Sequence, residues 1–351
     1  MLMVMNQVCN SMRNVLIVSP NFFYFGESIA SAFEKLGWKV SIASYDSPVH
    51  PYDWKNKIRY KISFHKEEMV KKGRLLFSQE VKRKYDELRP DLLFVVNGAA
   101  LIPEVVESIH QTAKVAVWFF DSVCKYPIMK EIVPYSDAVF CYEQSDMKII
   151  EQEFGRVSYF LPQAADLTRY YKIKGVEKKY DLVFAGDIWQ SEKRQRIIRK
   201  VVENFPNKKI LVWGVYKPWY KGLWRWLTRE RRDIYMNRNT SSEVLNQCYN
   251  ESRLVLNIHN EQQKDGANPK VYEIAASGAR QLCDSNSYIE HLFPAGAIDL
   301  YHSEQECIDL ISKILNEKSP LETADMAWRE TLEKHSFEKR ISTVLSTLEL
   351  L

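Results

Sequence analysis

Short apolar segments alternate with amphipathic segments of helical spacing along almost the whole chain, and this alternation constrains the fold more than any other feature. The apolar runs at 15–19, 91–96 and 115–119 have the length of strands buried inside a sheet. Apolar residues at helical spacing occupy much of the sequence between such runs. Strands that alternate with helices predict a doubly wound, parallel α/β sheet.

The alternation stops at 162–179 and then restarts, so it divides the chain into two parts. With 351 residues, the chain is also too long for one ordinary hydrophobic core. We therefore expect two α/β domains of similar architecture. The expected boundaries are an N-terminal domain over 1–165, a linker over 166–180, a second domain over 181–325 and a C-terminal helix over 326–351.

Composition narrows the class of protein. The hydrophobic content of 46% and the charged content of 27% fit a globular chain, and a net charge of +4 does not indicate a nucleic-acid partner. The six cysteines form no C-x-x-C pair, which favours a reducing cytoplasm without disulfides or a zinc site. Residues 1–11 do not resemble a signal peptide, and Met12 is an alternative start. No apolar run approaches the roughly 20 residues of a membrane span.

The segment 254–284 has the pattern of a strand, a polar loop, a helix and a second strand. Asn268 directly precedes Pro269, which is the usual order of an N-cap and a first helical residue. Gly278 ends the helical spacing. In an open α/β sheet such a loop lies at the carboxyl ends of the strands, where ligands bind. A helix N-terminus at that place favours an anion such as a diphosphate.

This segment carries a family resemblance. The run N-P-K-V-Y-E-I-A-A-S-G-A-R-Q-L-C-D, with the preceding L-N-I-H, resembles the donor-site signature of CgeB-like glycosyltransferases, N-x-R-x-F-E-x-x-A-x-G-x-x-x-L-x-D. Those enzymes have the GT-B fold, with two Rossmann-like domains facing across a cleft and a C-terminal helix that crosses back, and they are similar to the retaining family 4. Lys270 replaces the signature Arg, and Asp265 replaces the first Glu of the E-x7-E spacing that ends at Glu273.

The resemblance implies a nucleotide-sugar donor site around this helix. Glu273 would accept hydrogen bonds from the ribose diol, Asp265 would approach the donor sugar as a catalytic residue, and Lys270 and His259 would contact phosphate or sugar. The structural alternatives are a charge near a helix N-terminus, a turn aspartate, a surface lysine and a packed histidine. The donor-binding residues expected from the motif are His259, Asn268, Lys270, Tyr272, Glu273 and Gly278.

A second anion site is expected in the run FAGDIWQSEKRQR, where a strand and a glycine turn precede a basic helix. Gly186, Lys193 and Arg194 would stabilise the charge on the departing diphosphate, and Arg194 is favoured for its guanidinium fork. The alternative is a solvated basic helix face. Tyr216, after the next strand, is a candidate for stacking on the donor base. Because the chain contains no D-x-D, we expect a metal-independent reaction and no cofactor.

The first domain supplies candidates for the acceptor side. Asp121 ends the run VWFFDS, and W-x-x-D-S resembles the N-terminal half of CgeB-like enzymes. Asp121 would act as a general base or as a hydrogen-bond partner of the acceptor, and the alternative is a turn or capping aspartate. Gly26 resembles the glycine that lets the first loop of GT-B enzymes approach the substrate. The alternative is a turn before a helix.

Aromatic and basic residues are mixed in the insertion 216–239, which suits the surface of an anionic membrane or a docking surface. We expect a cytoplasmic hexosyl- or related glycosyltransferase, at the inner face of the membrane, that acts on a glycan or lipid-linked acceptor. Work on a cell-surface polysaccharide or lipopolysaccharide is implied by the family alone. Two alternatives stay open, namely a GT-B-type sugar-nucleotide epimerase and a non-catalytic two-lobed sugar-binding protein.

Overall fold

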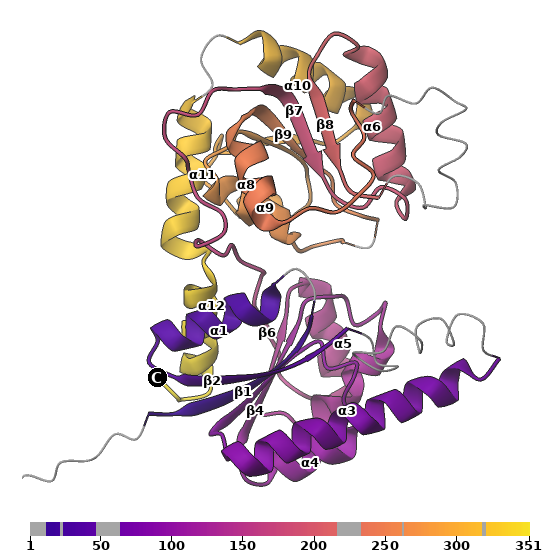
Figure 1. Cartoon of the computed structure of the whole chain (residues 1–351), viewed down its shortest axis with the longest axis vertical. Helices are drawn as coiled ribbons and strands as arrows, with labels where there is room; N and C mark the ends of the chain where they lie inside the picture. Colours follow the sequence, from indigo (N-terminus) through magenta and orange to yellow (C-terminus); the bar gives the residue numbers. More distant parts are fainter. Residues whose placement is uncertain (1–11, 22–23, 47–63, 216–232, 262, 318–320) are drawn as a thin grey trace, which may run out of the picture. The chain divides into compact units, whose positions relative to one another are not determined.

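The structure is a computed structural model, and it describes residues 12–21, 24–46, 64–215, 233–261, 263–317 and 321–351. It divides into two compact units, each built around one parallel sheet (Figure 1). Unit 1 comprises Met1–Cys141, Asp146–Leu161 and Ile341–Leu351. Unit 2 comprises Tyr142–Ser145 and Pro162–Arg340.

The sheet of unit 1 has six strands in the order β2-β1-β3-β4-β5-β6, and every pairing is parallel. The strands are β1 Asn14–Pro20, β2 Lys39–Tyr45, β3 Leu92–Val96, β4 Lys114–Phe119, β5 Ala138–Cys141 and β6 Tyr159–Phe160. The chain first moves outward from β1 to β2 and then returns to add β3 on the other side of β1. Such a reversal creates a crevice at the carboxyl ends of the strands, the usual ligand position in open α/β sheets.

Helices cover both faces of this sheet. They are α1 Phe25–Lys35, α3 Lys66–Leu88, α4 Pro103–His110, the 3₁₀ helix η1 Pro127–Tyr135 and α5 Gln144–Phe154. Val81 of α3 and Ile109 of α4 share one apolar cluster with Val95 of β3. Phe33 of α1 packs edge-on against Phe94, the neighbouring residue of β3, so α1 lies on the opposite face. The helix η1 has no counterpart in the sequence prediction, because Pro134 lies inside it and interrupts the helical pattern.

The sheet of unit 2 has five parallel strands in the order β11-β10-β9-β7-β8. The strands are β7 Tyr180–Ala185, β8 Ile210–Trp213, β9 Ser252–Asn257, β10 Gln281–Asp284 and β11 Asp299–Tyr301. The middle residues of β7 and β9, Leu182–Phe184 and Leu254–Leu256, are apolar and buried, as expected for a sheet covered on both faces.

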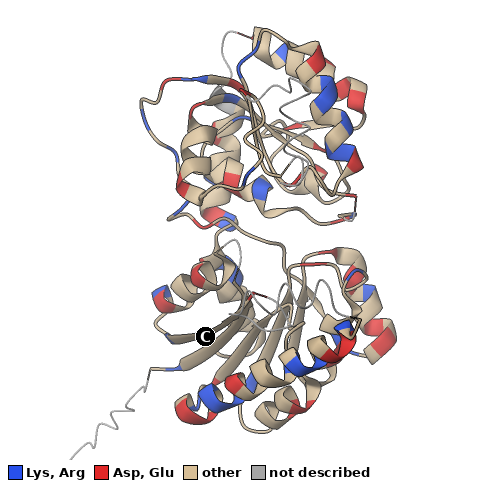
Figure 2. Ribbon diagram, turned by 45° about the vertical axis from the view of Figure 1, so that its right-hand side comes forward, with Lys and Arg blue, Asp and Glu red and all other residues tan. Residues whose placement is uncertain are grey.

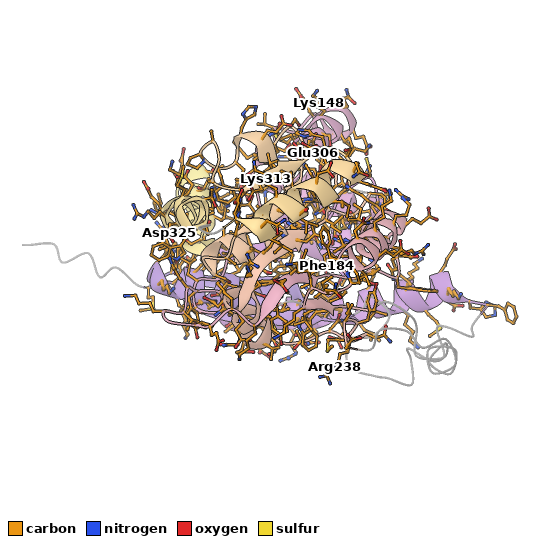
Figure 3. The ribbon with its side chains drawn as sticks, turned by 90° about the horizontal axis from the view of Figure 1, so that it is seen from above. Lys148, Phe184, Arg238, Glu306, Lys313 and Asp325 are labelled. Carbon is orange, nitrogen blue, oxygen red and sulfur yellow. The ribbon has the colours of Figure 1, made fainter. Side chains whose placement is uncertain are left out.

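Two helical layers enclose the unit 2 sheet (Figure 1). The helices are α6 Glu192–Asn204, α8 Ser242–Asn250, α9 Pro269–Ala276, η3 Ile289–His291, α10 Glu304–Asn316 and α11 Leu321–Lys334. Helices α8, α9 and α11 contribute to one apolar cluster, and α6 and α10 contribute to the other. On the second face, Lys313 of α10 is exposed, whereas Phe184 of β7 is buried (Figure 3). The prediction of two doubly wound parallel sheets is therefore confirmed.

The chain passes between the units near 161 and again near 340. The N–H of Ala165 donates to the carbonyl of His335 at 2.9 Å, and Ala165 also forms an isolated parallel bridge with Ser336. These contacts attach residues 162–165 to unit 2, whereas the sequence boundary assigns them to the first domain. The last helix, α12 Phe337–Thr347, begins in unit 2 and ends in unit 1.

Charged side chains lie mainly on the helices and loops, and the strands carry few of them (Figure 2). Within the described ranges, every helix is too short or too polar to cross a lipid bilayer. Most of the aromatic and basic insertion, including Tyr216, lies outside the described residues.

Candidate donor and acceptor sites

The carboxyl ends of β9 and β10 meet the beginning of α9. Asn257, the last residue of β9, is in register with Cys283 of β10. Asn268 is the N-cap of α9, and its Oδ1 accepts the N–H of Val271 at 3.2 Å. Pro269 follows at the first helical position, so the predicted start of this helix is confirmed.

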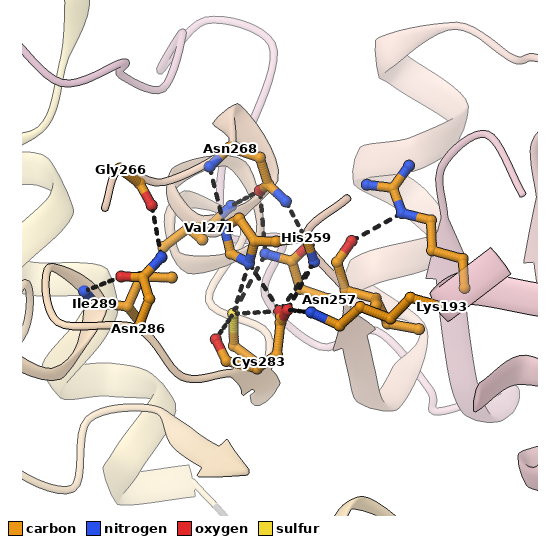
Figure 4. Close-up of polar contacts among 12 residues, drawn as sticks. Lys193, Asn257, His259, Gly266, Asn268, Val271, Cys283, Asn286 and Ile289 are labelled. Atoms are coloured by element: carbon orange, nitrogen blue, oxygen red, sulfur yellow. Dashed lines mark hydrogen bonds and ion pairs between the residues drawn. The ribbon is translucent and has the colours of Figure 1, made fainter. Parts of the chain in front are cut away.

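A reciprocal amide pair fixes this cap to the sheet. Nδ2 of Asn257 donates to Oδ1 of Asn268 at 3.1 Å, and Nδ2 of Asn268 donates to Oδ1 of Asn257 at 3.0 Å (Figure 4). Both side chains are buried. Because a buried amide is costly without partners, the pair holds the N-terminus of α9 at one position beside β9.

His259 is hydrogen-bonded to the start of the same helix. Its Nδ1 lies 2.7 Å from Oδ1 of Asp284, and the N–H of Asn268 donates to its Nε2 at 3.1 Å (Figure 4). Because Nε2 acts as an acceptor, the proton resides on Nδ1 and is donated to Asp284. Both ring nitrogens are thus engaged, and the residue is only 2% exposed. The geometry favours the structural interpretation of His259 over direct contact with a donor.

Asp284 links the histidine to a cation. The ammonium of Lys193 forms an ion pair with Oδ2 of Asp284. Burial opposes ionisation of Asp284, but His259 and Lys193 outweigh it and hold the pKa of this carboxyl well below its usual range. His259, Cys283 and Asp284 are close enough together to ligate a metal ion. Lys193 and the Nδ1–H of His259 already neutralise and bind the carboxylate, so the donor set fits a hydrogen-bonded ion pair.

Arg194 plays a different part from the predicted one. Its Nε donates to the carbonyl of Ile258 at 2.9 Å, and its NH1 donates to the carbonyl of Asp187 at 2.9 Å. The guanidinium therefore joins the loop after β7 to the end of β9. A Cβ atom on Gly186 would lie 3.5 Å from NH1 of Arg194. With Arg194 engaged by backbone carbonyls, Lys193 is the better candidate for a phosphate-binding cation at this edge.

Lys270 and Glu273 form an ion pair on the first turns of α9. Nζ of Lys270 lies 2.7 Å from Oε2 of Glu273, and Glu273 is 9% exposed. Burial and then the Glu273 carboxylate raise the pKa of Tyr170, so the phenol and the carboxylate lie close together. Lys270 thus brings a positive charge, and Glu273 a hydrogen-bond acceptor, to the helix start.

Asp265 lies in the loop that precedes α9, and it is hydrogen-bonded to residues that follow β5. Its Oδ2 accepts the N–H of Ser145 at 3.0 Å, and its Oδ1 accepts the hydroxyl of Ser145 at 3.1 Å. Oε2 of Glu143 accepts the N–H of Asp265 at 2.8 Å. Burial, and then Asp265, raise the pKa of Glu143 to about 8. Ser145 and Glu143 hold the pKa of Asp265 low against the effect of burial. At neutral pH the pair therefore carries one proton, on Glu143, and Asp265 is ionised.

Two motif residues lie away from the start of α9. Tyr272 is fully buried, and its hydroxyl oxygen lies 3.1 Å from that of Tyr288. Gly278 follows the helix with φ +65°, and a Cβ atom there would lie 2.8 Å from Cδ of Lys172. The structure gives these residues packing and helix-ending roles, because apolar burial and a left-handed C-terminal turn account for both.

In unit 1, Asp121 lies just beyond the end of β4. It is half-buried, and Nδ2 of Asn97 donates to its Oδ2 at 2.9 Å. Burial raises the pKa of Asp121 against the opposing effects of Lys125 and Asn97. Gly26 lies in the first turn of α1, where a Cβ atom would come within 3.3 Å of Cβ of Ser19. The missing side chain lets α1 pack closely against the end of β1.

The chain is similar to known proteins in part of its sequence and in its fold. Residues 193–346 match the family described as glycosyl transferase-like. Among curated proteins, none has a significant sequence match to the chain. Sucrose-phosphate synthase from Thermosynechococcus elongatus superposes with a TM-score of 0.68 and 12% identity, over 96% of this chain and 99% of that chain.

Two further solved structures share this fold. HepE from Anabaena, in complex with UDP-glucose, has a TM-score of 0.65 and 12% identity over 96% of this chain and 100% of its own. The UDP-forming α,α-trehalose-phosphate synthase from Burkholderia vietnamiensis has a TM-score of 0.62 and 13% identity, over 97% of this chain and 100% of its own. At these identities the structural similarity establishes the fold alone, and the family match covers residues 193–346. The protein is a glycosyltransferase of the GT-B fold.

Proposed function

We propose that this enzyme transfers a sugar from a nucleotide-sugar donor, held by unit 2, to a hydroxyl group of a glycan or lipid-linked acceptor. The observation that carries the proposal is the capped N-terminus of α9, which lies at the carboxyl edge of the sheet with Lys193 and Lys270 beside it. Helix N-termini with nearby cations bind phosphate groups. HepE, which is similar in fold, was solved with UDP-glucose, and this supports UDP-glucose as the first donor to test.

The hydrogen bonds at the helix start indicate which groups would contact the diphosphate. Pro269 has no N–H, and the N–H groups of Asn268 and Val271 donate to His259 and to the cap. The backbone N–H and the ammonium of Lys270, with the ammonium of Lys193, are then the proposed phosphate ligands. When the donor binds, Glu273 would release Lys270 and accept hydrogen bonds from the ribose diol. These cations would stabilise the departing diphosphate, so the proposed reaction needs no metal ion.

Asp121 is the proposed partner of the acceptor hydroxyl. The acceptor oxygen forms a bond to the anomeric carbon, and the bond from that carbon to the diphosphate breaks with its electron pair leaving on the diphosphate. Asp121 accepts the hydroxyl hydrogen bond and takes up the proton. We also propose retention at the anomeric carbon, because the signature around Glu273 resembles that of retaining enzymes. For this outcome the acceptor oxygen must attack from the same face that the diphosphate leaves. Asp265 is proposed to act indirectly, by shaping the loop before α9.

We further propose that the acceptor belongs to a cell-surface polysaccharide or lipopolysaccharide, and that the enzyme works in the cytoplasm at the inner membrane face. The mixture of Trp, Tyr, Lys and Arg in the insertion 216–239 supports the membrane contact. Binding to vesicles of zwitterionic lipid with and without anionic lipid tests it. We expect stronger binding to the vesicles with anionic lipid. Partition into neither kind would contradict the membrane contact, and equal partition into both would contradict the proposed role of the basic residues.

Calorimetric titration with UDP, dTDP, GDP, ADP and CDP tests the donor proposal. We expect one diphosphate to bind, and we expect Lys270→Met to weaken that binding about tenfold, because it removes a charged phosphate contact. Lys270→Arg should retain the affinity. Lys209→Met is the matched control, since Lys209 precedes β8 at the opposite edge of the sheet. If none of the five binds, the proposal fails. Conversion of UDP-glucose without an acceptor into an epimeric nucleotide sugar would favour an epimerase instead.

A further inference from the structure

The turn after β3 holds Asn97 in an uncommon backbone conformation. Its φ is +62°, in the left-handed region that Asn tolerates better than most residues. The residue is only 4% exposed, and its N–H donates to the carbonyl of Trp118 at 3.0 Å. A buried polar residue in a strained conformation is a sign that its side-chain position matters.

The Asn97 side chain joins the ends of β3 and β4. Its Oδ1 accepts the N–H of Phe120 at 2.7 Å and that of Asp121 at 3.3 Å. Its Nδ2 donates to Oδ2 of Asp121 at 2.9 Å. Within the described part of the chain, Oδ1 of Asp121 accepts no hydrogen bond. The amide therefore fixes one carboxylate oxygen and leaves the other available to a ligand.

The charged and titratable groups around Asp121 come from several elements. The ammonium of Lys125, in the loop after β4, favours the ionised carboxylate. The phenol of Tyr45, the last residue of β2, is buried, and its pKa is raised by that burial and then by Asp121. The hydrogen bond from Asn97 also favours the ionised form, whereas burial of Asp121 opposes it. Asn97 is therefore the neutral group that both orients the carboxylate and keeps it charged.

On the basis of the proposed sugar transfer, we propose that Asn97 is the positioning residue of the acceptor side. Its amide holds Oδ2 of Asp121, so that Oδ1 is presented to a hydroxyl group of a polyhydroxylated acceptor. The position of Asn97 at the carboxyl end of β3, beside the point where the strand order reverses, is where open α/β sheets bind ligands.

Fluorine NMR of protein labelled with 3-fluorotyrosine tests this role without a substrate. The Tyr45 resonance is identified by its absence in Tyr45→Phe, and it is followed from pH 4 to pH 7.5. A pH-dependent change in its chemical shift that is absent in Asp121→Asn reports the titration of Asp121. We expect Asn97→Gly, which suits the left-handed backbone, to raise the midpoint of that titration by about 1 pH unit. Asn97→Asp should raise it further, because it places a second carboxylate beside the first.

Asn237→Gly is the matched control, since Asn237 has φ +52° and lies in unit 2. It should leave the midpoint unchanged. A folded Asn97→Gly or Asn97→Asp protein that titrates with the wild-type midpoint would overturn the proposal. The diphosphate titrations give a separate result, because Asn97→Gly should bind the diphosphate as the wild type does. Failure of the wild type to bind any diphosphate refutes the proposed function, whereas the fluorine titration still decides the role of Asn97.

Discussion

Nδ1 of His259 lies 2.7 Å from Oδ1 of Asp284, and this buried pair connects the end of β10 to the N-terminus of α9. On one side His259 accepts the N–H of Asn268, and on the other side Asp284 binds Lys193. The proposed donor site is thus held by a continuous chain of polar contacts. Such a chain keeps the helix start and a cation in fixed positions before any ligand arrives.

Replacing Asp284 should destabilise the protein in a pH-dependent way. Its pKa is lowered in the folded state, so its stabilising contribution is present above the unfolded pKa of about 4 and is lost as the pH falls below it. We expect Asp284→Asn to lower the unfolding free energy by about 3 kcal/mol at pH 7, the cost of breaking a buried ion pair. The difference from wild type should shrink at pH 3, as measured by urea unfolding.

The control for this substitution is Asp309→Asn, because Asp309 is exposed on α10. It should change the unfolding free energy by less than about 0.5 kcal/mol. An Asp284→Asn protein as stable as this control at pH 7 would show that the ion pair contributes nothing.

Removing the cap of α9 should affect both stability and donor binding. Asn268→Ala removes the hydrogen bond to Val271 and the pair with Asn257, so we expect a loss of about 2 kcal/mol in unfolding free energy. Diphosphate affinity should fall at the same time. Ser303→Ala removes the corresponding cap of α10 and should destabilise the protein without changing that affinity. Equal loss of affinity in the two variants would argue against a donor site at α9.

Ionisation of the Glu143 carboxyl should lower the stability of the folded protein as the pH rises. Its pKa is raised to about 8 by burial and by Asp265, so its favourable contribution is complete below the unfolded pKa of about 4.3. That contribution is lost as the pH passes through about 8. Between pH 5 and pH 8.5 the unfolding temperature of wild type should therefore fall more than that of Glu143→Gln. The exposed variant Glu203→Gln should follow wild type. Parallel profiles for wild type and Glu143→Gln would contradict the protonation of Glu143 in the folded protein.

Local sequence signals predict much of the fold and the helix at the proposed site. The apolar runs predicted the parallel strands, because strands that are buried on both faces need a continuous apolar sequence. The order of Asn268 and Pro269 predicts the start of α9, since both residues act through their own backbone geometry. These features depend on neighbours within a few positions and can be recognised without knowledge of tertiary contacts.

The polar partners of the site could not be predicted in the same way. Asp284 belongs to a different strand from His259, and only the pairing of β9 with β10 brings them together. Likewise, nothing in the sequence around Arg194 indicates that its guanidinium binds the carbonyl of Ile258. Glu143 is far from Asp265 in sequence and carries no motif. Tyr272 is part of the motif, but its complete burial depends on tertiary packing that the motif does not reveal.

Hydrogen exchange of the full chain, with and without the diphosphate that binds best, tests the central claim most directly. A donor site at the start of α9 predicts slower exchange in peptides that cover 257–276 and the beginning of α6, because the ligand orders those backbone amides. Lys270→Met, compared at the same ligand concentration, should show weaker protection there. Protection confined to unit 1, or bound diphosphate without any protection around α9, would contradict the account.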